Sequence, residues 1–146
     1  MRITRETDYA VRCVLFLSGR PETKASVAEI AGTMEIPSSF LPKIVQKLAR
    51  EKLVESSRGV GGGVHLLKKP AEISLYDVIN CIEDGGVGLN DCVIKERGCH
   101  RSPFCTVHPV WLAIQEVVKE QLKSYTFDNL LHSSRATGLD AFPFPE

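Results

Sequence analysis

The stretch from residue 26 to residue 67 constrains the fold of this chain more than any other. It carries two short helical patterns around a tight turn, then two alternating strand patterns joined by glycines: residues 26–34, 35–37, 38–50, 53–57, 58–63 and 64–67. Two short helices around a tight turn are typical of a helix-turn-helix unit, and a glycine-joined hairpin after it is typical of a wing. We therefore predict a mainly α fold, a winged helix-turn-helix with a two-stranded wing.

Capping signals define where the two short helices begin. Ser26 and Glu29 have the spacing of a capping box at the start of the first helix. Either Ser38 or Ser39 is expected to cap the second helix. Pro42 falls within the first turn of that helix, where its missing amide costs little.

The second helix and the hairpin leave side chains free for a partner. Outside the apolar stripe of this helix we expect these residues to face outward: Phe40, Lys43, Gln46, Lys47 and Arg50. Glycines in the hairpin, among them Gly59 and Gly61, let backbone approach DNA, and Arg58 can project into a groove. Taken alone, the two helices could form a generic helical hairpin, and the glycines could serve only a tight turn between strands. Their combination favours double-stranded DNA as the partner.

The sequence does not suggest an enzyme. The glycine run lies between two strands rather than between a strand and a helix, and it lacks the Gly-Lys-Ser/Thr ending of a phosphate-binding loop. No pairing of a nucleophile with a general base is recognisable. We therefore predict a binding protein without catalytic residues.

Three cysteines and a histidine crowd into the 17 residues from Cys92 to His108, with Cys99 and Cys105 between them. Thiolates gathered in a polar, glycine-containing loop suit an iron-sulfur cluster or a zinc ion. The spacing Cys-x6-Cys-x5-Cys-x2-His differs from that of a zinc ribbon and from the tight ferredoxin run. The pattern favours a metal or cluster site over unligated thiols.

The remaining cysteines and histidines have simpler roles. Cys13 and Cys81 lie in apolar helical stripes, where a thiol usually serves for packing. His65, His100 and His132 are expected at the surface. Five cysteines is an odd number and argues against a complete disulfide framework. No run approaches the roughly 20 apolar residues of a membrane span and no signal peptide is apparent, so we expect a cytoplasmic protein.

Charge is distributed unevenly along the chain. Residues 1–69 hold 12 Lys and Arg against 7 Asp and Glu, whereas residues 70–146 hold 6 against 11. The net charge of zero therefore conceals a positive N-terminal half. Such a half suits contact with phosphates, although solvated helix faces would give the same excess.

The second half of the chain predicts a helix, a loop and a long helix. Ser74 and Asp77 open a helix that ends near Asp84, and the irregular stretch 87–109 carries the cysteine loop. Apolar positions then recur at helical spacing to about Leu131, on a helix too long for the preceding short helices to cover, which predicts a homodimer. The predicted units are a winged domain 1–69, a connecting helix and loop 70–91, a cluster loop 92–108, a dimerisation helix 109–132 and a flexible tail 133–146.

These features together resemble a known family. Met1-Arg2-Ile3-Thr4, Tyr9-Ala10-Val11, the helix-turn-helix, the arginine-glycine wing and the spaced cysteines are similar to winged-helix regulators of the Rrf2 type. The likeness covers about residues 1–132. It implies a transcription regulator in which Ser39, Phe40, Lys43 and Arg58 stand at the positions that contact DNA.

Two branches of the family differ in how they would hold a cluster. The cysteine loop looks most like the iron-sulfur cluster regulator IscR, in which three cysteines and a histidine hold [2Fe-2S]; this implies Cys92, Cys99, Cys105 and His108 as ligands. In some members of the nitric-oxide-sensing NsrR branch, an aspartate near the N-terminus joins three cysteines around [4Fe-4S], and Asp8 stands at that position. The resemblance favours [2Fe-2S] and His108, because imidazole is a softer ligand than carboxylate. The gap after Cys92 is one residue longer than in IscR.

The resulting hypothesis is a homodimeric, sequence-specific DNA-binding regulator that senses iron-sulfur, redox or nitric oxide status through a cysteine-ligated cluster. The recognition helix departs from IscR, since Pro42 replaces an acidic residue and Lys43 a neutral amide, so the DNA target does not carry over. The alternatives are a zinc-binding or thiol-switch regulator without iron, and an iron-sulfur electron carrier.

Overall fold

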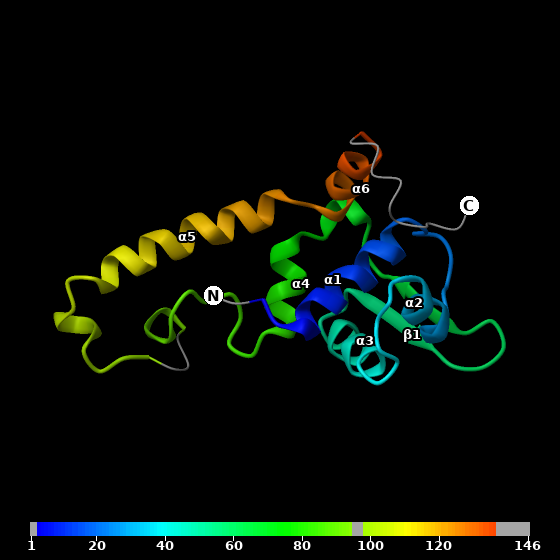
Figure 1. Ribbon diagram of the computed structural model, residues 1–146, viewed down its shortest axis with the longest axis horizontal. Helices are drawn as coiled ribbons and strands as arrows, with labels where there is room; N and C mark the ends of the chain where they lie inside the picture. The colour runs from blue at the N-terminus through cyan, green and yellow to red at the C-terminus, as the bar shows by residue number, and fades with distance from the viewer. Residues whose placement is uncertain (1–2, 95–97, 137–146) are drawn as a thin grey trace.

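The computed structural model describes residues 3–94 and 98–136 of the 146. Within them the chain forms the following elements in order (Figure 1): α1 Arg5–Ser18, α2 Val27–Thr33, α3 Leu41–Arg50, β1 Val54–Ser57, β2 Gly63–Leu66, the 3-10 turn η1 Pro70–Glu72, α4 Leu75–Ile82, the 3-10 turns η2 Asp91–Val93 and η3 Ser102–Phe104, α5 His108–Ser124 and α6 Phe127–Ala136. The predicted winged helix-turn-helix is confirmed. None of the described helices combines the length and apolarity needed to cross a membrane.

The hydrophobic core lies where α1, α3, α4, α6 and the two strands meet (Figure 1). Its fully buried side chains come from all of these elements: Phe16, Leu41, Ile44, Leu48, Val54, Val64, Ile73, Val78 and Phe127. Burying one such side chain contributes about 1.5–3 kcal/mol. The core therefore fixes the recognition helix α3 against α1 and α4.

The wing is an antiparallel pair in which Val54 faces Leu66 and Ser57 faces Gly63. Gly59 and Gly61 adopt φ of 89° and 73°, a region that side chains other than glycine rarely enter. A Cβ on Gly62 would lie 2.5 Å from the Ser57 carbonyl oxygen. The tip of the wing therefore depends on its glycines, as the sequence predicts.

Two capping expectations need correction. Ser26 Oγ accepts the Glu29 amide at 3.1 Å, but the Glu29 carboxylate pairs with Arg20. The prediction that Ser38 or Ser39 caps α3 is wrong, because Phe40 occupies the N-cap position without a side-chain bond. The capping box of α4 is complete, as predicted.

The predicted single helix to about Leu131 is also wrong at its C-terminal end. The chain turns extended at Tyr125, whose carbonyl accepts the Leu75 amide at 2.9 Å, and the Phe127 amide donates to Ile73 O at 2.9 Å. The Thr126 hydroxyl then accepts the Asn129 amide and starts α6. Burial of Phe127 places α6 in the winged domain, so residues 133–136, expected in a flexible tail, are helical.

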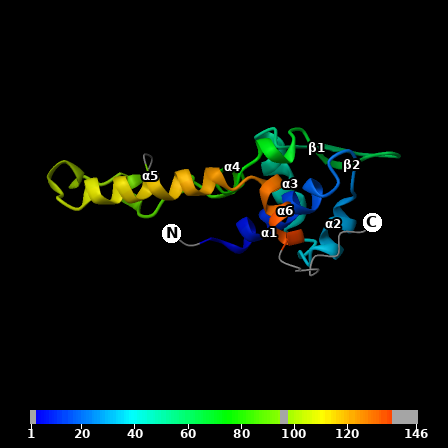
Figure 2. The ribbon, with the colours of Figure 1, turned by 90° about the horizontal axis from the view of Figure 1, so that it is seen from above.

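Helix α5 extends away from the winged domain, and the described residues between α4 and α5 lie alongside it (Figures 1 and 2). At 17 residues it is about 25 Å long. Gln115 is 2% exposed, and its side chain accepts the Leu89 amide at 2.8 Å and donates to Val87 O. This residue fixes the start of the cysteine loop on α5.

Candidate nucleic-acid interface and cysteine pocket

Most residues predicted to contact DNA are exposed, whereas Lys47 is bonded to other residues of the chain. The exposed ones lie at the start of α3 and on the wing: Ser39, Phe40, Lys43, Arg58, Gly59 and Gly61. Within the described part of the chain, Lys43 and Arg58 have no carboxylate partner. Two cations without an intramolecular partner are free to meet phosphate or base edges.

Phe40 is anchored to α1. Its ring stands edge-on to Tyr9 with centroids 5.3 Å apart, and the Arg12 guanidinium lies 5.6 Å from the Tyr9 centroid. Arg12 also pairs with Asp8 at 2.7 Å and donates to Met34 O at 3.3 Å, at the end of α2. These contacts fix the N-cap residue of the recognition helix and the end of α2 to α1.

Lys47 does not face outward as predicted. Its ammonium lies 3.0 Å from the Glu6 carboxylate and donates to Ile82 O at 3.2 Å, and its side chain is only 18% exposed. Lys47 lies on the polar side of α3, but the start of α1 and the end of α4 cover this part of that side. Lys47 as a DNA contact therefore stays an untested prediction, with a structural role now evident.

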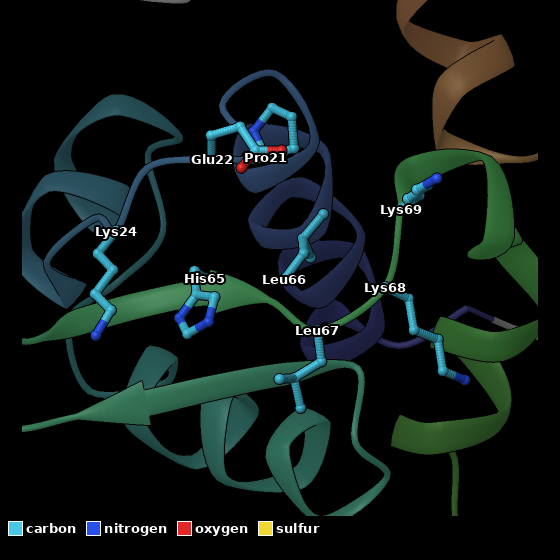
Figure 3. A pocket seen from close by; sticks show the side chains of 8 residues that line it. All are labelled: Pro21, Glu22, Lys24, His65, Leu66, Leu67, Lys68 and Lys69. Atoms are coloured by element: carbon cyan, nitrogen blue, oxygen red, sulfur yellow. The ribbon is translucent and has the colours of Figure 1, made fainter.

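Sequence reasoning missed a basic surface at the base of the wing (Figure 3). Lys24, Lys68 and Lys69 line a pocket of about 400 Å³ together with His65 and one acidic residue, Glu22. Lys24 donates to Ser57 Oγ at 3.1 Å, and His65 Nε2 lies 3.5 Å from a Glu55 oxygen. The three lysines point in different directions in Figure 3, so they do not converge on one small ligand. They spread positive charge along this side of the wing.

The four predicted cluster ligands come together. Cys92 on η2, Cys99, Cys105 after η3 and His108 at the start of α5 line one pocket of about 340 Å³, together with Trp111. Nδ1 of His108 is buried and has no hydrogen-bond partner among the residues that the structure describes. Three thiols and an uncommitted imidazole nitrogen around one pocket are the donor set that an iron-sulfur cluster or zinc requires. The residues present therefore fit such a group.

The pocket is not a ready-made site for a single ion. Among residues 3–94 and 98–136, no three Cys, His, Asp or Glu side chains are grouped to hold one metal ion. Asp8 of the same chain lies on α1 in its pair with Arg12 and does not line the pocket. Of the two candidates for the fourth ligand, one chain brings only His108 to the cysteines.

The other two cysteines differ in setting. Burial raises the pKa of the fully buried Cys13 to about 12. Burial, with a smaller effect from Glu51, raises the pKa of Cys81 to about 11. Both thiols stay protonated near neutral pH, which agrees with a packing role.

A sequence model of the Rrf2 family, described as an iron-dependent transcriptional regulator, matches residues 3–133. The chain belongs to the Rrf2 family. It is similar to the HTH-type transcriptional regulator NsrR of Shouchella clausii (strain KSM-K16), with 31% identity over 133 residues that cover 90% of this chain and 89% of the relative.

Solved structures of other proteins share the fold. T. potens IscR aligns with a TM-score of 0.75 at 22% identity, over 94% of this chain and 91% of that one. CymR, the global cysteine regulator of B. subtilis, aligns with a TM-score of 0.68 at 26% identity, over 89% and 95%. This Rrf2 protein is therefore a DNA-binding transcription regulator and not an enzyme.

Proposed function

We propose that this Rrf2 protein is a sequence-specific regulator whose affinity for DNA depends on an iron-sulfur cluster bound by Cys92, Cys99 and Cys105. The observation that carries the proposal is that these thiols and His108 line one pocket, and that the buried Nδ1 of His108 has no partner in the described part of the chain. His108 is the fourth ligand in this proposal, and [2Fe-2S] is favoured over [4Fe-4S]. When bound, the cluster would supply iron that reacts with oxidants and nitric oxide, and its occupancy would depend on iron supply.

The DNA-binding side of the proposal rests on α3 and the wing. Lys43 faces the major groove from the recognition helix, and Arg58 on the glycine turn reaches the adjacent minor groove. Ser39, Phe40, Gly59 and Gly61 complete the contact surface. DNA and this regulator would then share the cytoplasm.

The protein acts as a homodimer in this proposal. Apolar side chains stand exposed along α5, including Val110 at 52%, Ile114 at 42% and Val117 at 63%. A lone helix that projects from its domain with such a face leaves much apolar surface in water. Pairing of two α5 helices covers it and sets two recognition helices about one DNA turn, roughly 34 Å, apart.

A thiol switch without iron is the second candidate. Cys99 is exposed, so an oxidant can reach it directly. The similarity in fold to CymR, the global cysteine regulator of B. subtilis, supports this alternative. Zinc would occupy the same donors but give no colour.

Anaerobic purification separates these functions. Iron and sulfide assays with a visible spectrum identify a cluster, and Trp111, the only tryptophan, lines the pocket and should lose fluorescence when a cluster binds. Replacing Cys92, Cys99 or Cys105 with Ala should each abolish iron binding, because a missing thiolate leaves an iron exposed to solvent. A protein that binds zinc alone, or variants that keep full iron and colour, would contradict the proposal.

A further inference from the structure

The last turn of α4 is tied to the first turn of α1 by one carboxylate. Glu83 Oε1 accepts the Thr4 amide at 3.2 Å and the Thr4 hydroxyl at 2.8 Å, and it also accepts the buried Thr7 hydroxyl. Thr4 is the N-cap residue of α1. A negative charge at a helix N-terminus is favourable, so Glu83 acts as a second cap supplied from another helix.

The same turn of α4 is tied to the recognition helix. Lys47 of α3 donates to the carbonyl of Ile82, the residue before Glu83, and pairs with Glu6 of α1. Both side chains of this pair are less than one quarter exposed, at 18% and 24%. Partial burial makes these bonds less screened than those of a surface pair.

The segment that carries Cys92 contacts the end of α4 as well. The Gly86 amide donates to Glu83 O at 2.8 Å, and the chain turns through Gly85 and Gly86 at φ of 85° and 74°. Ile94, two residues after Cys92, packs against this turn and the residues after it: a Cβ on Gly85 would lie 2.9 Å from Ile94 Cγ2, and one on Gly88 2.4 Å from Ile94 Cγ1. A contiguous series of contacts thus joins the Cys92 segment to Glu83.

We propose that Ile82 and Glu83 form the junction through which the cysteine pocket controls the recognition helix. The proposal rests on the function proposed above, since it names the residues that transmit a change in the pocket to DNA. Glu83 is a positioning residue here and touches neither a cluster nor DNA. When the Cys92 segment moves, Ile94 shifts the glycine turn, and the bonds from Glu83 and Ile82 carry that shift to α1 and α3.

The junction has the requirements for such coupling. Glu83 is bonded to the start of α1, and Ile82 is bonded to Lys47 of α3. Displacing the end of α4 therefore changes the packing of α1 and α3 together. Coupling between two sites typically amounts to a 5- to 150-fold change in affinity, which is the range a few charge-assisted bonds supply. The signal then reaches Lys43 and Phe40 through α3 itself, without a contact between the cysteine loop and DNA.

The junction is tested in the full-length protein by measuring the dissociation constant for DNA in the cluster-loaded and cluster-free forms. The ratio used below is the larger of these two constants divided by the smaller. Glu83→Ala removes the carboxylate and leaves the Thr4 and Thr7 hydroxyls bonded to each other at 3.0 Å. Lys47→Met removes the second tie. We expect the double variant to lower the wild-type ratio at least fivefold, toward one. Because a lost DNA contact weakens both forms alike, the ratio isolates the coupling.

A variant on the loop side and a control complete the experiment. Ile94→Ala should lower the ratio without touching α1 or α3, so it decides the matter if the double variant folds poorly. Glu116→Gln with Lys119→Met removes a surface pair on α5 and should keep the wild-type ratio. Iron content and Trp111 fluorescence should remain those of the wild type in all variants.

The outcomes separate the two proposals. Junction variants that bind iron normally and keep the wild-type ratio would overturn the junction and leave the proposed function intact. A wild-type protein that binds iron but has a ratio of one would contradict cluster control of DNA binding, and the junction with it. Loss of iron in Glu83→Ala would make Glu83 part of the cluster pocket and would overturn its role as a positioning residue.

Discussion

Tyr9 and Phe40 meet edge-on, with ring planes 71° apart, and so join the middle of α1 to the residue that begins the recognition helix. Phe40 is still 40% exposed. The pair explains how a helix without a side-chain N-cap keeps a defined start. It also makes a residue outside the DNA interface responsible for the shape of that interface.

Replacing Tyr9 with Leu should therefore weaken DNA binding as well as the fold. Leucine keeps apolar volume but loses the aromatic pair and the Arg12 contact, each about 0.5–1.5 kcal/mol. Chemical denaturation and a DNA titration measure the two effects. Tyr76→Leu, at an aromatic residue away from α3, is the control. Unchanged DNA affinity for Tyr9→Leu would show that Phe40 needs no such support.

The wing offers a test in which only one methyl group is added. Gly62→Ala places a Cβ against the Ser57 carbonyl, so the turn must open, at a cost of about 1–3 kcal/mol. Affinity for DNA should fall, because Arg58 is moved with the turn. Gly32→Ala on α2 meets no atom within 4 Å and should be neutral or stabilising by about 0.5–1 kcal/mol. Equal affinities for the two variants would exclude the wing from the interface.

Much of this architecture could be predicted from sequence because its signals are local. The period of α3, the glycines of the wing and the capping box of α4 each lie within a few residues. The break at Tyr125 could not be predicted in the same way. The apolar pattern continues across the break. The hydrogen bonds that stabilise it join Tyr125 to Leu75 and Phe127 to Ile73, and these partners lie far apart in the sequence.

The candidate site shows the same limit. Spacing identified the cysteines and His108, and the structure brings them to one pocket. Lys47 was misplaced because helical periodicity says which side of α3 is polar and not what covers it. Gln115 and Glu83 have no sequence signal at all, since their roles depend on partners 26 to 79 residues away.

The carboxylate of Glu83 predicts a pH dependence of stability. Burial acts to raise its pKa, but the hydrogen bonds from Thr7 and Thr4 outweigh burial and hold the pKa below its usual value. A depressed pKa in the folded state adds stability above the unfolded pKa, about 4.3, and that stability is lost as the pH falls through the folded pKa. Glu83→Gln should therefore be less stable than wild type at pH 7, with the gap closing below about pH 4. Urea unfolding at both pH values checks this, and a gap that is independent of pH would contradict it.

The five thiols should differ in reactivity in the folded, cluster-free protein. Iodoacetamide at pH 8 requires thiolate and access, and Cys13 and Cys81, with pKa values of about 12 and 11, offer little thiolate. We expect mass spectrometry to find modification at Cys99 first, then at the half-buried Cys92 and Cys105. Cys13 and Cys81 should react only after denaturation. Early modification of Cys13 would mean that the helix packing around it opens readily.

The exposed face of α5 makes the oligomeric state the most direct test of how the protein meets DNA. Ile114→Glu with Val117→Glu puts two charges on the apolar face, where a partner helix would leave them buried and unpaired. Each such charge costs several kcal/mol in an interface and almost nothing on an open surface. Sedimentation should therefore give a dimer for the wild type and a monomer for the variant, with or without a cluster.

The monomer should also bind a full DNA site poorly, because one winged domain reads only half of it. Glu116→Gln, on the same helix at a polar and exposed position, should leave both the dimer and DNA binding unchanged. A wild-type protein that sediments as a monomer at micromolar concentration would require another cover for Val110, Ile114 and Val117. Pairing of two α5 helices could then no longer explain how two recognition helices read both halves of one DNA site.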